Sequence, residues 1–501
     1  MTEPASPRVT LDSWNRAAIR FIDPPSFTWT PVPGAARYRV SWSSAGNGAG
    51  TRETGDPRFD FDPVWTGIPE GKVEWTVEPR GADGTPLFHP GPFSFHRVPD
   101  FDGREERPLD WKGAARRTLD HLLALPPCQH TGEPRYITHS WHVPPGVEEP
   151  GALSVVAYPA LHYPSFVSFF LEALRHERDD GIRRRLENEL ATLRETILRD
   201  RTADIGVAPR MPLTTRVVYL PPGKDDAWIA EKGTITTFRA ARMGEAILAL
   251  HAYRPDQRLL DYAAHIAQVL SGLQRDDGSW PYRIRPDTGE VTEPYTSGGI
   301  TTAVFFETFM ETTGRDTYRR TVEQAARWTI ENPCRTNRWE CAFEDVSPFP
   351  PYDNLQNFDT LDAIRHLCRH RRTIPDAVPI ARRLNRWIED QFVVFGPAEV
   401  PPGAHAHPPS VMEQYFCYWA MEVHTAHWIQ ALLALHEATG EASHRTKAVR
   451  AANAIVRGQD PDGRLSTWGI DTRKGKRYMQ SDWYGCNAVA AEVLYRMTDR
   501  P

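Results

Sequence analysis

Apolar residues follow two different periods along the chain, and the period changes near residue 101. Before that point apolar and polar residues alternate in four short segments, at residues 27–29, 38–42, 73–77 and 93–95. Alternation gives a strand one apolar face, and clusters rich in Gly, Pro and Asp separate the segments as turns do. Residues 1–100 are therefore predicted to form a small β-sandwich domain.

Beyond a polar linker, residues 108–501 carry apolar residues at every third or fourth position, which is typical of amphipathic helices. Short turns that contain Gly or Pro join consecutive helices into hairpins. Twelve helices are predicted, at residues 110–125, 162–177, 181–200, 234–253, 256–274, 298–313, 316–332, 357–371, 375–393, 422–438, 442–458 and 484–498.

The helical hairpins carry an internal repeat. Gln274 and Gly278, after the second helix of one hairpin, are matched by Gln459 and Gly463 after the second helix of another. Five complete hairpins lie between residues 162 and 458, and the first and last predicted helices remain to close a circle. The pattern predicts a mainly α fold, in which an (α/α)6 toroid at residues 108–501 follows the β-sandwich.

The first helix of each hairpin is the more apolar of the two, as residues 300–306 show against 318–323, so we expect it on the inside of the ring. The loops that precede the inner helices then meet at one end of a central cavity. Five polar and aromatic segments are expected to line it, at residues 158–163, 293–297, 352–359, 413–427 and 482–484.

Two stretches of sequence resemble a known arrangement of domains. PPSFTWTPVPGAARYRVSW, followed by VEWTVEPRGADG, is similar to fibronectin type III-like modules, particularly those that precede the catalytic toroid of heparinase II/III-type polysaccharide lyases. The predicted ring resembles the toroid of many glycoside hydrolases and polysaccharide lyases. These resemblances imply a carbohydrate-active enzyme with a glycan substrate.

Composition and charge exclude several other classes. Residues of the AVILMFWYC set make up 40% of the chain and charged residues 25%, as in folded soluble proteins. With 59 Lys and Arg against 65 Asp and Glu the net charge is −6, so no basic field favours nucleic acid as a partner. No apolar stretch fits a membrane span or a signal peptide, and we expect no membrane partner and a cytoplasmic location.

The sequence predicts neither a metal nor an organic cofactor. The six cysteines are scattered and form no C-x-x-C pair. No Gly-rich phosphate loop is present, and no third ligand accompanies His424 and His427.

The densest group of reactive side chains lies within residues 413–427. Glu413, Tyr415, Trp419, His424 and His427 bring together a carboxylate, aromatic rings and two imidazoles that share one helical face. We expect Tyr415 to act as general acid and His424 as general base, with Trp419 and His427 in contact with substrate and Glu413 as the acid of a hydrolase. The alternative is that both histidines are core residues and the aromatic residues only fill the rim.

A second group precedes the helix predicted at residues 357–371. Asn354 or Asn357 is expected to neutralise a substrate carboxylate, and Tyr352 and Asp353 to bind substrate. The alternative is that Asn357 or Asp359 only caps that helix.

The first and last inner helices supply the remaining candidates. His162, Asp482 and Tyr484 are expected among the catalytic groups, and Tyr163 and Trp483 among the substrate contacts. Packing of aromatic residues where the ring closes explains these residues equally well.

The leading functional prediction is cleavage of uronate-containing glycans by β-elimination, which needs a base, a neutralised carboxylate and an acid. Heparinase II/III-type lyases use Tyr and His for this chemistry. The alternatives are a glycoside hydrolase with a carboxylate pair chosen from Glu413, Asp353 and Asp482, and a glycan-binding protein without catalysis. Terpene cyclases and lanthipeptide cyclases share the ring, but their acidic clusters and zinc ligands are absent from the sequence.

Overall fold

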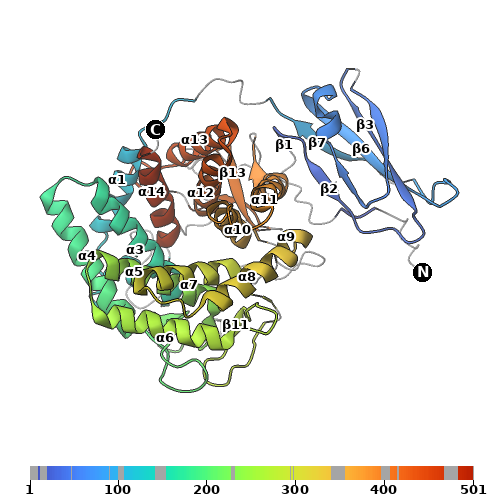
Figure 1. Cartoon of the computed structure of the whole chain (residues 1–501). Coiled ribbons are helices and arrows are strands. Elements are labelled where there is room, and N and C mark those ends of the chain that lie inside the picture. Colours follow the sequence, from blue (N-terminus) through green and yellow to red (C-terminus); the bar gives the residue numbers. More distant parts are fainter. Residues whose placement is uncertain are drawn as a thin grey trace.

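A computed structural model describes residues 9–11, 20–46, 48–89, 91–99, 106–140, 154–226, 229, 232–293, 295–296, 298–339, 356–395, 407–414, 417–465, 467 and 483–499. A helical ring occupies most of the molecule, and a smaller region of β-sheet lies to one side of it (Figure 1). Within the described residues, no helix combines the length and hydropathy that crossing a membrane requires.

The N-terminal region contains two sheets around one aromatic core. β1 (Arg20–Phe21), β7 (Phe93–Arg97), β6 (Gly71–Arg80), β3 (Arg37–Ser44) and β4 (Gly50–Thr54) form a five-stranded sheet in that order. β2 (Ser26–Thr28) pairs with β5 (Arg58–Asp60), and η1 (Asp62–Gly67) follows. Phe27 of β2 stacks on Trp75 of β6 with ring centroids 4.5 Å apart, so the two sheets share their apolar faces. The four predicted strands are confirmed, whereas the fibronectin type III-like sandwich stays a prediction.

In the described part of the chain twelve long helices make up the ring, and each predicted helix is confirmed with both ends within three residues of the prediction. The six inner helices are α3 (Pro159–His176), α5 (Thr237–Tyr253), α7 (Gly299–Thr313), α10 (Phe358–Arg369), α12 (Glu422–Thr439) and α14 (Tyr484–Thr498). The six outer helices are α1 (Trp111–Ala124), α4 (Asp180–Arg199), α6 (Gln257–Leu273), α8 (Arg319–Glu331), α11 (Ala377–Phe392) and α13 (Ala442–Arg457). The mainly α toroid is therefore observed.

Several shorter elements also lie in the ring region. The sequence does not predict them, because a segment of two to five residues is too short to show a hydrophobic period. They are the helices α2 (Arg135–Thr138) and α9 (Pro333–Thr336) and the strands β8 (Val155–Ala157), β9 (Arg216–Tyr219), β10 (Ile235–Thr236), β11 (Arg283–Ile284), β12 (Val393–Val394), β13 (Ser410–Gln414) and β14 (Cys417–Met421). β12, β13 and β14 form one antiparallel sheet directly ahead of α12.

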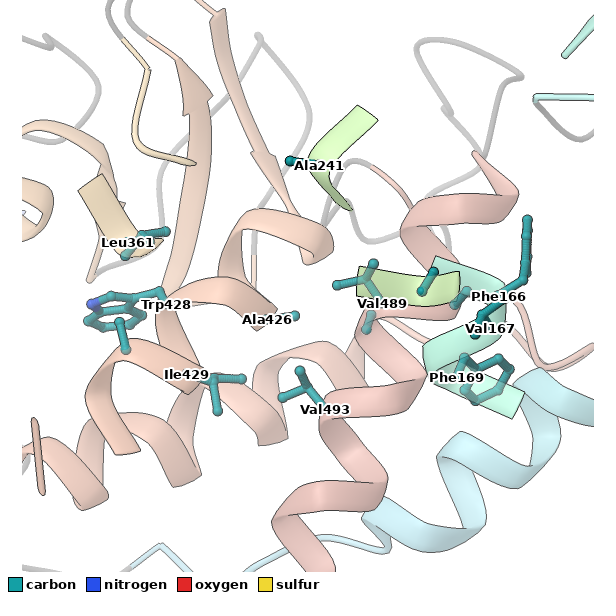
Figure 2. Packing of buried hydrophobic residues seen from close by; sticks show 14 of the residues in the cluster. Phe166, Val167, Phe169, Ala241, Leu361, Ala426, Trp428, Ile429, Val489 and Val493 are labelled. Atoms are coloured by element: carbon teal, nitrogen blue, oxygen red, sulfur yellow. The ribbon is translucent and has the colours of Figure 1, made fainter. Parts of the chain in front are cut away.

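The ring closes between the first and last helices, as the sequence predicts. α14 packs between α3 and α12, and α1 covers it from outside. Figure 2 shows Val489 and Val493 of α14 lying between Ile429 of α12 and Phe169 of α3. On the outside, Trp111 Nε1 of α1 donates a hydrogen bond to Asn453 Oδ1 of α13 at 2.8 Å.

The repeated Gln and Gly residues have a structural role. Gln274 Nε2 donates to the carbonyl oxygens of Gly278 and Thr321, at 3.1 and 2.9 Å, which joins a turn to the next outer helix. Gln459 Nε2 donates to the carbonyl oxygens of Gly463 and Ala114, at 3.1 and 2.8 Å, and joins the last such turn to α1. Both glycines have φ near +95°, a conformation that L side chains rarely adopt.

Charged groups connect the β-sheet region to the ring. Lys447 Nζ of α13 lies 2.8 Å from both carboxylate oxygens of Glu389 of α11 and also contacts Asp23. The backbone N–H of Ser26 donates to Asp390 Oδ2 at 3.0 Å.

Candidate active site

A cavity of about 770 Å³ follows the axis of the ring, and residues of all six inner helices line it. This confirms the prediction that the first helix of each hairpin lies inside. The polar groups at one end come from the first two turns of these helices and from the hairpin of β13 and β14.

His424, in the first turn of α12, is held in one tautomer. Asn357 Nδ2 donates to the carbonyl oxygens of Met412 and Glu413, the latter at 3.0 Å, which fixes the orientation of the amide. Asn357 Oδ1 then faces His424 Nδ1 at 2.7 Å and can only accept. His424 therefore carries its proton on Nδ1, and Nε2 keeps the lone pair that a general base requires.

His424 and His427, in the first two turns of α12, line the cavity and are neutral. Burial lowers the pKa of His424 to about 3. Burial, followed by the charge of Arg242, lowers the pKa of His427 well below its ordinary value. The ring of Phe358 packs edge-on against His427 with centroids 4.7 Å apart.

A fixed carboxylate lies beside His427. Asp362 Oδ2 of α10 accepts hydrogen bonds from Arg242 Nη2 and Thr301 Oγ1, both at 2.7 Å. Burial alone would raise the pKa of Asp362, but the charges of Arg242 and Arg365 outweigh it and the pKa is lowered. Asp362 is therefore an ionised carboxylate that joins α5, α7 and α10.

Two further carboxyl groups have a pKa near neutral pH. Burial, followed in its effect by the charge of Asp362, raises the pKa of Asp359 to about 7. Glu245 of α5 lines the cavity, and burial raises its pKa to about 7 as well. The cavity thus holds an ionised Asp362 and a Glu245 whose pKa is raised to about 7, so the two carboxyl groups suit different steps of acid–base chemistry.

His162 faces the cavity from α3. Burial, followed by the charge of Arg239, lowers its pKa to about 3. Its ring lies edge-on to Trp483 with centroids 5.7 Å apart. A Cβ on Gly485 would approach His162 Cδ2 to 2.7 Å, so only glycine on α14 leaves room for this imidazole.

The cavity brings together five of the predicted site residues, from three parts of the chain. His162, Glu413, His424, His427 and Trp483 all line it. The roles predicted for them stay predictions.

Three other predicted residues are described but have different surroundings. Asn357 uses its side chain to hold His424 and the β13 strand, so it neither caps α10 nor faces a substrate carboxylate. Tyr163 and Tyr484 are buried outside the residues that line the cavity, and the Tyr163 hydroxyl lies 3.1 Å from Asp200 Oδ2. Asp359 does not cap α10 either, because it lies inside the first turn of that helix, where its N–H donates to Gln356 Oε1 at 3.1 Å. We leave Tyr163 and Tyr484 out of the proposed site.

The remaining predicted residues lie outside the part of the chain that the structure describes. They are Tyr352, Asp353, Asn354, Tyr415 and Asp482, together with the side chain of Trp419.

Four charged residues of the cavity wall are not among the predicted site residues, namely Arg239, Arg242, Glu245 and Asp362. The sequence nevertheless contains a pattern that could have identified these four residues. Each is a charged residue inside a helix that was assigned to the apolar inner ring, where a charge must face either a partner or the cavity.

No protein-family model and no curated protein matches the sequence. Solved structures share the fold. A family 76 glycoside hydrolase from a bovine Bacteroides thetaiotaomicron strain is 11% identical, with 98% of each chain covered and a TM-score of 0.52. A D-mannose isomerase is 11% identical, over 80% of this chain and 100% of its own, with a TM-score of 0.56. The cellobiose 2-epimerase from Spirochaeta thermophila is 12% identical, over 78% and 96%, with a TM-score of 0.54.

Proposed function

We propose that this chain is a carbohydrate-converting enzyme in which His424 removes a C–H proton beside a carboxylate, and that it cleaves uronate-containing glycans by β-elimination. The observation that carries the proposal is the tautomer of His424. Its Nδ1–H is bound by Asn357, so its Nε2 is the atom that accepts a proton from a sugar in the cavity.

The substrate carboxylate is expected to meet an arginine. Arg239 lines the cavity beside His162 and is our candidate for neutralising the uronate. Arg239 replaces Asn357 in this role, because the Asn357 amide is fully used. A negative charge on the bound substrate also raises the pKa of His424 toward the range in which a general base is effective.

The elimination follows from these positions. His424 Nε2 takes the C5 proton, the electron pair of that C–H bond forms the C4=C5 double bond, and the C4–O bond breaks. The departing oxygen takes a proton from a general acid, for which Tyr415 remains the predicted residue. The carboxylate carries the charge that develops at C5, which is the reason for an arginine in the site.

The named structural neighbours support sugar chemistry in this type of ring. The D-mannose isomerase and the cellobiose 2-epimerase convert sugars, and moving hydrogen at a carbon next to a carbonyl is a proton transfer that histidine can perform. Removal of a proton from a carbon next to a carboxylate needs the same kind of base and the same stabilisation of negative charge.

A glycoside hydrolase is the second candidate, because the cavity holds one carboxyl group with a lowered pKa and one with a raised pKa. Glu245 would act as the acid, and Asp362 as the base or nucleophile. The family 76 glycoside hydrolase with the same fold is consistent with this alternative.

Incubation with a panel of uronate-containing glycans distinguishes these possibilities. A lyase produces a conjugated unsaturated uronate, which is followed by its ultraviolet absorbance. We expect His424→Asn to lower kcat by about 10²–10⁴-fold. His436→Asn, on the same helix but outside the cavity lining, is the matched control and should keep full activity.

Two other outcomes of this incubation would indicate a different function. Release of reducing sugar without unsaturated product favours the hydrolase, and saturable glycan binding without any product favours a binding protein. Either result contradicts the proposed elimination.

A further inference from the structure

Three side chains of types that bind metals meet where two neighbouring inner helices pack together. Glu307 comes from α7, His366 from the last turn of α10, and His370 directly follows that helix. His366 also lines the cavity that contains His424. Their ligand atoms all lie within 4.8 Å of one another. His370 Nε2 is 3.1 Å from Glu307 Oε1, and His366 Nδ1 is 3.8 Å from Glu307 Oε2.

His366 supplies an independent sign of a ligand. Its side chain is only 2% exposed, and within the described part of the chain its Nδ1 has no hydrogen-bond partner. The distance of 3.8 Å to Glu307 is too long for a hydrogen bond. A buried ring nitrogen that bonds to nothing is costly, and this one is directed at a carboxylate that already approaches a second imidazole.

The spacing of the three atoms suits a small cation. Tetrahedral Zn²⁺ with bonds of about 2.0–2.2 Å holds its ligand atoms about 3.4 Å apart. Glu307 Oε2 lies 3.3 Å from His370 Nε2 and 3.8 Å from His366 Nδ1, on either side of that value. Small rotations of the side chains would therefore make these two distances equal.

We propose that Glu307, His366 Nδ1 and His370 Nε2 bind a divalent transition-metal ion of the zinc class, which links α7 to α10. Two imidazoles and one carboxylate favour such an ion over Ca²⁺ or Mg²⁺, which prefer oxygen ligands. The side chain of His370 is 28% exposed and offers a path for entry. The site goes beyond the proposed elimination, and it departs from the expectation that no metal is bound.

The guanidinium of Arg369 lies near this site but is hydrogen-bonded to a different carboxylate. Arg369 Nη1 is 3.9 Å from Glu307 Oε2, whereas Arg369 Nη2 bonds to Glu311 Oε1 at 2.5 Å. We do not propose a metal site at the second cluster, which consists of Glu172, His176 and Asp499. Arg175 and Arg496 both approach Glu172, at 3.2 and 3.7 Å, and occupy its carboxylate.

Titration of the chelator-treated full chain with Co²⁺ tests the site. We expect one ion per chain, with the visible absorption of a tetrahedral Co²⁺ complex, and a melting temperature that rises with the concentration of Co²⁺ or Zn²⁺. His370→Asn and Glu307→Gln should each weaken the affinity by roughly tenfold or more.

Two control variants locate the ion. His436→Asn removes an exposed imidazole of α12, and His424→Asn removes the imidazole of the proposed base, and both should bind Co²⁺ like the wild type. Absence of saturable binding, unchanged affinity in His370→Asn, or loss of binding only in His424→Asn overturns the proposal. If Glu307→Gln does not fold, His370→Asn decides, because its ring is partly exposed.

Discussion

At the scale of single residues, two aspartates one turn apart on α10 have pKa values shifted in opposite directions. Asp362 is ionised because Arg242 and Thr301 both donate to it. Asp359 lacks such charged donors among its described contacts, and burial beside Asp362 raises its pKa to about 7. Identical side chains thus acquire different chemistry from their neighbours, which is the general basis for separating acids from bases in an active site.

Asp359→Asn tests this difference through stability. The folded state holds the Asp359 proton more tightly than the unfolded state, whose pKa is near the ordinary 3.8. Folding stability from this group is therefore lost as the pH rises from about 4 to about 7. We expect the melting temperature of Asp359→Asn, relative to wild type, to be higher at pH 8 than at pH 5. An equal difference at both pH values would show that Asp359 is ionised throughout.

At the scale of helices, the ring depends on close approaches between inner neighbours. Gly244 of α5 faces the ring of Phe305 of α7, and a Cβ at this position would lie 2.3 Å from Phe305 Cε2. A methyl group there pushes α5 and α7 apart, and both helices line the cavity.

Gly244→Ala should lower the free energy of unfolding by about 1–3 kcal/mol, because the core has no space for the added carbon. Gly272→Ala on the outer helix α6 is the matched control, since nothing lies within 4 Å of its Cβ position. That substitution should instead stabilise by about 0.5–1 kcal/mol through helix propensity. Urea unfolding of both variants measures the difference, and equal effects would contradict the described packing.

The sequence predicts helices better than it predicts the site. The helices appear in it because amphipathic periodicity is local, and even α14, which closes the ring, is predicted at its observed bounds. The pairing of Arg242 with Asp362 and the hydrogen bond from His424 to Asn357 join residues far apart in the chain. The sequence can mark such polar residues as unusual, but which of them come into contact depends on the folded ring.

At the scale of the whole molecule, residues near the start of the chain help to bury charges of the ring. Lys447 is 7% exposed and lies between Glu389, which is equally buried, and Asp23, which is 51% exposed. We propose that residues 1–100 form a separate domain that packs here without supplying catalytic groups.

Substitutions in this contact should have unequal costs. Lys447→Met leaves the carboxylate of Glu389 buried without its cation, and should cost about 3–5 kcal/mol of unfolding free energy. Asp23→Asn removes the exposed partner and should cost less than about 1 kcal/mol. Combining Lys447→Met with Glu389→Gln should recover part of the loss. Equal costs for the two single variants would contradict the described burial.

The proposed base is tested most directly with a uronate glycan that carries deuterium at C5. Removal of the C5 hydrogen by His424 predicts that the product is unsaturated and has lost its deuterium to solvent, and that both signals disappear together in His424→Asn. A product that keeps deuterium at C5, detected by mass spectrometry or NMR, would contradict the elimination and favour hydrolysis through Glu245 and Asp362.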